Sequence, residues 1–200
     1  MSKVAIVDSG GANIASLLFA FERLGVGAEL TTDSRTIRAA DRVLLPGVGA
    51  ARDAMQRLID ADLVDVIREL DQPVLGICLG MQLLFDRSAE GDSKCLGIFR
   101  GCAERFPDSA GLPVPHMGWN SVRDTGGSRL LAGIDDDSYF YFVHSFAVPV
   151  VAATTGLCEY GHAFTAVAER ENFYATQFHP ERSGDDGARL LRNFLGLDGG

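Results

Sequence analysis

A cysteine held between two glycines is the first residue in this chain whose context suggests chemistry. The segment PVLGICLGMQ, residues 73–82, places Cys78 between Gly76 and Gly80, where an apolar run gives way to a helical pattern. This spacing is the nucleophile-elbow pattern with cysteine in place of serine, and N–H groups at a helix start favour a thiolate. Free cysteine is also a common small core residue, so this stretch alone leaves both roles open.

A base for this cysteine is predicted in TQFHPERSG, where His179 ends an apolar run. Pro180 restricts the preceding residue to an extended conformation, which places Glu181 on the same side as the imidazole. The carboxylate can then hold one ring nitrogen while the other accepts the thiol proton. The alternative is a surface turn with an ion pair to Arg182. His116 and His144 lack an adjacent acid, and His162 lies in a predicted turn, where a solvated or loop-bonded histidine is expected.

A glycine turn in LLPGVGAARDAM, residues 44–55, is a candidate oxyanion hole. The backbone N–H groups of Val48 and Gly49, together with that of Leu79, are predicted to face a developing oxyanion. The glycines would also allow a peptide flip, so we expect a resting state with a carbonyl facing this site. The alternative is a simple turn from strand to helix.

The elements that must position these residues alternate along the first half of the chain. Apolar runs at 3–8, 26–32, 42–47 and 73–80 are followed by helical patterns at 13–25, 33–40, 51–70 and 81–86. We therefore expect an α/β fold of one domain, residues 1–200, with a mostly parallel, flavodoxin-like central sheet flanked by helices. The carboxyl ends of such strands share one edge, so Cys78, His179 and Glu181 are expected to converge there.

After Ser88 the pattern changes to extended runs split by turns. These runs predict a mostly antiparallel meander added to the same sheet, closed by a helix at about 185–195. The segment 111–122 contains two prolines and is predicted to be an irregular crossing loop.

Composition argues against several classes of partner. The net charge is -9 and no block of lysine or arginine occurs, which disfavours nucleic acids and anionic membranes. No signal peptide or membrane span is evident, so we expect a cytoplasmic protein. The four cysteines form no CxxC pair and are expected to be reduced thiols; no metal or other cofactor is expected.

Five motifs in chain order give these residues a family resemblance: PGVG, GICLGMQ, VPHMGWN, YFVHS and QFHPE. The chain resembles the class I, triad-type glutamine amidotransferases, and more narrowly the glutaminase subunits of imidazole glycerol phosphate synthase in histidine biosynthesis. The resemblance implies that Cys78 attacks the side-chain amide of L-glutamine, that His179 carries the proton to ammonia, and that Glu181 orients the imidazole. Water would then hydrolyse the thioester to glutamate. It also implies a set of substrate-binding residues: Gly49, Gln82, Ser145 and Phe146.

The same resemblance implies a partner. It would be a separate (β/α)8-barrel cyclase, bound as a heterodimer, which uses the ammonia to form imidazole glycerol phosphate and aminoimidazole carboxamide ribotide. All 200 residues fit the amidotransferase pattern, so we expect no synthase segment in this chain. Trp119 in PHMGWN is the predicted interface residue; the alternative is that it packs over the local core.

The chain departs from the family pattern at four positions: Gly11, Ala12, Ala51 and Phe146. Other functions remain open from the sequence. These are an amidotransferase subunit for anthranilate or aminodeoxychorismate synthesis, a hydrolase of γ-glutamyl compounds, and a catalytically silent scaffold. The intact Cys, His and Glu set argues against the scaffold.

Overall fold

Strands and helices alternate through the first half of the chain. A computed structural model describes residues 3–10, 14–107 and 111–198; the departures at Gly11 and Ala12 lie outside these ranges. The elements are β1 (Val4–Val7), α1 (Ile14–Arg23), β2 (Ala28–Thr31), α2 (Ser34–Ala39), β3 (Arg42–Gly47), α3 (Ala51–Asp60), α4 (Val64–Arg68), β4 (Val74–Cys78) and α5 (Leu79–Leu84). The predicted alternation is confirmed, except that 51–70 forms two helices, because Asp62 adopts a φ of 55° between them.

The second half is rich in strands. They are β5 (Phe85–Ser88), β6 (Ser93–Lys94), β7 (Phe99–Arg105), β8 (His116–Asp124), β9 (Ser138–His144), β10 (Phe146–Ala147), β11 (Thr154–Tyr160), β12 (His162–Arg170) and β13 (Phe173–Thr176), followed by α6 (Gly184–Leu195). Short 3-10 turns occur at Glu90–Asp92 and Pro180–Arg182.

The main sheet has nine strands in the order β2-β1-β3-β4-β13-β12-β11-β8-β9. Its first five strands are parallel and the remaining pairs are antiparallel. This confirms the predicted α/β fold. The prediction that every later strand joins this sheet is wrong, because β10, β7, β5 and β6 form a separate four-stranded sheet.

The prediction of an irregular loop over 111–122 is also wrong. From His116 onward this segment is β8, paired with β9 in a continuous register from His116↔His144 to Val122↔Ser138. Pro113 and Pro115 precede the strand, so neither interrupts its ladder of hydrogen bonds.

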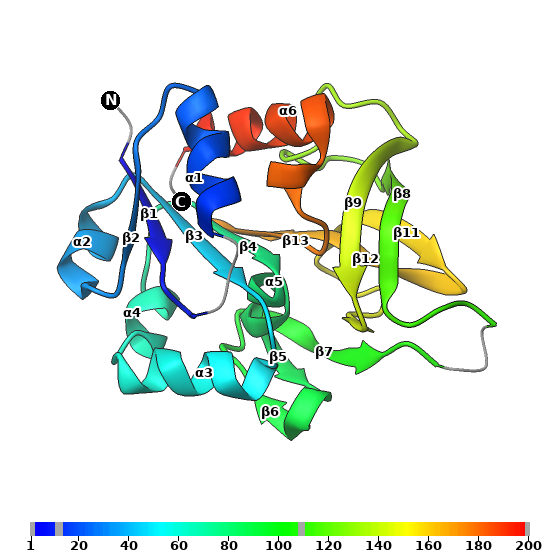
Figure 1. The fold of residues 1–200 in the computed structure, drawn as a ribbon, viewed down its shortest axis with the longest axis horizontal. Coiled ribbons are helices and arrows are strands. Elements are labelled where there is room, and N and C mark those ends of the chain that lie inside the picture. Colours follow the sequence, from blue (N-terminus) through cyan, green and yellow to red (C-terminus); the bar gives the residue numbers. More distant parts are fainter. Residues whose placement is uncertain (1–2, 11–13, 108–110, 199–200) are drawn as a thin grey trace.

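Helices cover both faces of the parallel strands (Figure 1). Helices α1 and α6 lie on one face, where they pack on Val4 and Ile6, while α2 to α5 and the small sheet lie on the other, against Ala5 and Val7. This explains why the parallel strands are continuous apolar runs. In the part of the chain that the structure describes, no helix is both long and apolar enough to span a bilayer.

Candidate active site

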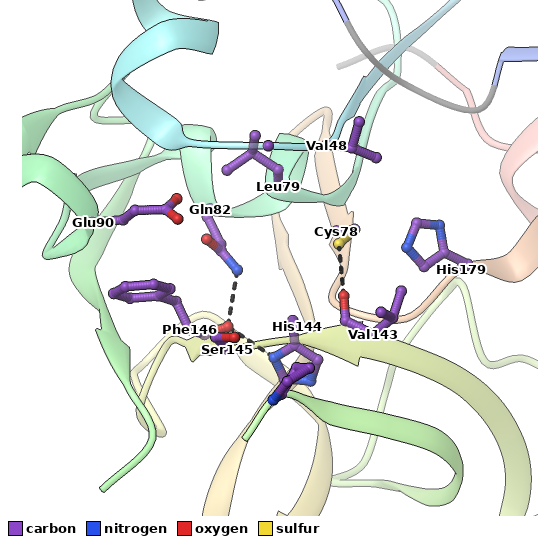
Figure 2. A pocket seen from close by; sticks show the side chains of 12 residues that line it. Val48, Cys78, Leu79, Gln82, Glu90, Val143, His144, Ser145, Phe146 and His179 are labelled. Carbon is purple, nitrogen blue, oxygen red and sulfur yellow. Dashed lines mark hydrogen bonds between the residues drawn. The ribbon is translucent and has the colours of Figure 1, made fainter. Parts of the chain in front are cut away.

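Three neighbouring parallel strands end side by side at one edge of the sheet. Register pairs Gly47 of β3 with Cys78 of β4, and Ile77 of β4 with Thr176 of β13. The segments that follow these strands line one side of a cavity of about 340 Å³, and the residues from Val143 to Phe146 line the opposite side (Figure 2). Eight of the nine predicted site residues line it: Val48, Gly49, Cys78, Leu79, Gln82, Ser145, Phe146 and His179.

Cys78 occupies a strained turn between β4 and α5. Its backbone has φ 55° and ψ -111°, a conformation that residues with side chains rarely adopt. A Cβ on Gly80 would lie 1.7 Å from the carbonyl oxygen of Leu45, and one on Gly76 would lie 2.7 Å from Cδ1 of Leu84. Both glycines are therefore required by contact with the neighbouring strand and helix.

His179 lies between Cys78 and Glu181. Its Nδ1 is 2.8 Å from Oε1 of Glu181, whose side chain is only 3% exposed. The other ring nitrogen points toward the sulfur of Cys78 (Figure 2), and this Nε2 is buried with no hydrogen-bond partner among the described residues. The alternative of a surface pair between Glu181 and Arg182 is wrong, because the Arg182 guanidinium lies 4.4 Å over the ring of Tyr141.

The protonation state of His179 follows from these neighbours. Burial by itself lowers the pKa of His179, but the interactions with Cys78 and then Glu181 outweigh it and raise the pKa to about 10. The imidazole is therefore cationic at neutral pH. A cationic imidazole beside a thiol stabilises the thiolate and has a proton to give to a leaving group.

The oxyanion candidates lie on the wall of the cavity formed by β3 and α5. Leu79 is the first residue of α5, where a backbone N–H has no acceptor within the helix. Gly49 has a φ of 89°, which favours glycine, and an added Cβ there would meet nothing within 4 Å. These positions suit an oxyanion hole, which remains a prediction.

The side-chain amide of Gln82, a predicted substrate contact, is held by hydrogen bonds within the protein. Its Nε2 donates to the carbonyl of Phe146 at 2.9 Å and to Oε1 of Gln177 at 3.1 Å. Both amide protons are therefore used within the protein, so only the carbonyl oxygen of Gln82 is left for a ligand.

Glu90 is a cavity residue that no sequence motif indicates. It lies in the 3-10 turn after β5, and its Oε2 accepts from the backbone N–H of Ala51 at 2.9 Å. Ala51, one of the departures from the family pattern, is fully buried at the start of α3. Glu90 brings a carboxylate to the cavity wall on the side away from His179 (Figure 2).

His116 and His144 form a buried chain beside the cavity. Nδ1 of His144 contacts the carbonyl of Phe146 at 2.8 Å, and its Nε2 contacts Nδ1 of His116 at 3.0 Å. Burial lowers the pKa of His144 to about 3 and that of His116 to about 4. Both rings are neutral at physiological pH and support the Ser145–Phe146 segment.

No cluster of three or more histidine, cysteine or acidic side chains within the described ranges could hold a metal ion. All four cysteines are free thiols.

Comparison with known proteins identifies the family to which this chain belongs. The profile of the class-I glutamine amidotransferases matches residues 5–196. The chain belongs to this family. It is 50% identical over 195 residues to the "Imidazole glycerol phosphate synthase subunit HisH" of Xanthomonas axonopodis pv. citri (strain 306), covering 98% of each chain. The protein of the same name from Pasteurella multocida (strain Pm70) is also 50% identical over 98% of each chain.

Solved structures of amidotransferases share the fold. A crystal structure of a glutamine amidotransferase superposes with a TM-score of 0.74 at 19% identity, covering 96% of each chain. PurLQS from Thermotoga maritima gives 0.74 at 17% identity, covering 97% of each chain. The class I amidotransferase predicted from the five motifs is thus confirmed, and the chain is a member of an enzyme family.

Proposed function

We propose that this amidotransferase is the glutaminase subunit of an imidazole glycerol phosphate synthase, acting as one domain. It hydrolyses glutamine to glutamate and ammonia and supplies the ammonia to a cyclase in histidine biosynthesis. The convergence of Cys78, His179 and Glu181 at one cavity carries the glutaminase activity. The names of the relatives at 50% identity favour this synthase over anthranilate or aminodeoxychorismate synthesis.

The first half of the reaction starts from the Cys78 thiolate and the cationic imidazole of His179. The Cys78 thiolate attacks the side-chain carbonyl carbon of glutamine, and the carbonyl oxygen becomes an oxyanion facing the N–H groups of Leu79 and the Val48–Gly49 segment. Collapse of this intermediate breaks the C–N bond while His179 gives its proton to the leaving nitrogen. The products of this half are ammonia and a γ-glutamyl thioester.

The second half returns the site to its starting state. Neutral His179 takes a proton from water as the water attacks the thioester, and the thiolate leaves, releasing glutamate. Glu181 holds Nδ1 throughout and stabilises the cationic ring.

Glutamine also carries an α-ammonium and an α-carboxylate that the cavity must accept. We assign the ammonium to Glu90 and the carbonyl oxygen of Gln82, because both lie on the cavity wall. The backbone of Gly49, Ser145 and Phe146 would hold the rest of the amino-acid group.

An apolar face beside the cavity is the proposed docking site for the cyclase, a (β/α)8 barrel forming a heterodimer. Met117 and Trp119 of β8 and Tyr139 of β9 are 63%, 55% and 59% exposed. Trp119 therefore does not pack in the core, and it lies on a strand rather than on a loop. Alternation along β9 places Val143, which lines the cavity, on the same face as Tyr139. Docking here would let ammonia pass to the partner without crossing open water.

A peptide flip next to this face would couple glutamine hydrolysis to the partner. A Cβ on Gly47 would lie 3.1 Å from the backbone nitrogen of Gly80, so that end of the segment is tightly packed, whereas Gly49 is open. We infer that the Val48–Gly49 peptide turns its N–H into the cavity when the cyclase holds its substrate.

The net charge of -9 supports a function without nucleic acid or membrane partners, and we propose that the protein acts in the cytoplasm with no cofactor.

The test is glutamate release from glutamine by the purified chain alone, with the cyclase, and with the cyclase and its ligand. We expect turnover that rises when the partner is liganded. Cys78→Ser should abolish it, whereas Cys102→Ser, a half-buried cysteine on β7, should retain it. Absence of turnover under every condition would favour the silent scaffold. Retention of activity in Cys78→Ser would refute the assigned nucleophile, and equal rates with and without the liganded cyclase would refute the flip.

A further inference from the structure

A fully buried glutamine amide lies against the nucleophile. Gln177 follows β13, two residues before His179, and is 0% exposed. Its Nε2 donates to the sulfur of Cys78 at 3.9 Å, and its Oε1 accepts from Nε2 of Gln82 at 3.1 Å. A buried amide is costly unless its polar atoms have partners, so these two contacts account for its presence in the core.

The orientation of this amide is fixed by a chain of hydrogen bonds. The carbonyl oxygen of Phe146 can only accept, so the atom of Gln82 that faces it must be the NH2 group. The same NH2 group faces Gln177, whose oxygen must therefore point toward Gln82. The NH2 group of Gln177 is then left to face Cys78. No other assignment of the two amides gives every contact a donor and an acceptor.

We propose that Gln177 is a positioning residue for the nucleophile: its amide N–H holds the sulfur of Cys78 and stabilises the thiolate, and Gln82 locks that amide in place. This role rests on the proposed glutaminase function and adds a residue to its nucleophile.

Ionisation of the thiol explains why an N–H donor is useful here. The Cys78 thiol donates toward the carbonyl of Val143 at 3.9 Å, a contact that suits the protonated form alone. Once the proton is lost the sulfur can only accept, and the N–H of Gln177 then favours the thiolate. The titratable groups on the same cavity wall are His179, His144 and Glu90, and a change at Gln177 leaves all three in place.

A purely structural role is the competing explanation. Gln177 also joins α5 to the segment after β13 through Gln82, and loss of that link would lower stability without changing the thiol. The two roles differ in what happens to the reactivity of Cys78.

The experiment is alkylation of Cys78 by iodoacetamide across pH 5 to 10, followed by mass spectrometry of the peptide that contains it. In Gln177→Leu we expect the midpoint of the alkylation profile to rise by about one pH unit. We expect the kcat for glutamine to fall about tenfold, with KM changed less than about twofold. Gln72→Leu is the matched control, because Gln72 donates its amide to the carbonyl of Ile37, outside the cavity; its profile should equal that of the wild type.

A second variant, Gln82→Leu, tests the proposal if Gln177→Leu does not fold. Gln82→Leu keeps the Gln177 amide but frees it to turn, and should move the midpoint in the same direction by a smaller amount. An unchanged alkylation profile in folded Gln177→Leu, or in Gln82→Leu if the first does not fold, would overturn the proposal and leave Gln177 a structural residue. Alkylation needs neither glutamine nor the cyclase, so a failure of the proposed glutaminase activity is recognised separately from a failure of this inference.

Discussion

Acidification should destabilise this protein through its buried histidine pair. The Nδ2 group of Asn120 only donates, to Nε2 of His116 at 3.2 Å, and the carbonyl of Phe146 only accepts, from Nδ1 of His144 at 2.8 Å. Each ring must therefore donate from Nδ1 and accept at Nε2, and both must be neutral. A second proton on either ring would set two N–H groups against each other, in addition to the cost of a buried charge.

The size of the effect follows from the two lowered pKa values. Histidine in the unfolded chain has a pKa near 6.5, whereas folding lowers the pKa of His144 to about 3 and that of His116 to about 4. The unfolded state binds more protons in this range. The contribution of the two neutral rings to the free energy of unfolding is therefore fully present above pH 6.5 and is lost as the pH falls toward 4. At about 1.4 kcal/mol per pH unit, the contribution of each histidine to the free energy of unfolding falls by about 2 kcal/mol between pH 7 and 5.

His179 acts in the opposite direction. Its pKa is raised to about 10, so its contribution is present below pH 6.5 and is lost as the pH rises toward 10. The two buried rings together therefore lower the free energy of unfolding by about 4 kcal/mol between pH 7 and 5, and His179 offsets a part of this loss. The loss is a large part of the 5–15 kcal/mol typical of a folded domain.

Urea unfolding followed by far-UV circular dichroism at pH 7 and pH 5 measures this loss. His162→Gln, which removes an exposed histidine, should keep the full pH dependence, and the double variant His116→Gln/His144→Asn should lose most of it. A free energy of unfolding in the wild type that differs by less than about 1 kcal/mol between the two pH values would refute the reasoning.

Three further changes test the elbow, the substrate site and the partner face. Gly80→Ala should lower the free energy of unfolding in urea by about 3 kcal/mol or more, because the new Cβ would lie 1.7 Å from the Leu45 carbonyl oxygen. Gly27→Ala is the control and should cost little, because open space surrounds its Cβ. Glu90→Gln should raise the KM for glutamine about tenfold with kcat nearly unchanged, measured by steady-state glutamate release, because it removes the charge assigned to the α-ammonium; an unchanged KM would contradict that assignment. Trp119→Ala should weaken cyclase binding by about 2 kcal/mol in calorimetry while leaving unfolding nearly unchanged, since the side chain is 55% exposed; unaltered affinity would exclude this face.

The sequence alone determined the local features of this protein. The alternation of apolar runs and helical patterns predicted the parallel strands, and the glycines around Cys78 predicted the elbow, because both depend on residues close together in the chain. The order of motifs identified the family. The convergence of Cys78 with His179 could also be expected, since the carboxyl ends of parallel strands share an edge.

Packing between distant segments sets which groups meet at the cavity and how. The resemblance implied Gln82 as a substrate contact, yet both of its N–H donors go to Phe146 and Gln177, which lie 64 and 95 positions further along the chain. Glu90 reaches the cavity from a short turn that carries no motif. The pairing of β8 with β9 and the separate small sheet were likewise not predicted. Such contacts form between segments distant in sequence, and the hydrogen-bond partner of a side chain is set by which segments pack together, not by the residues beside it.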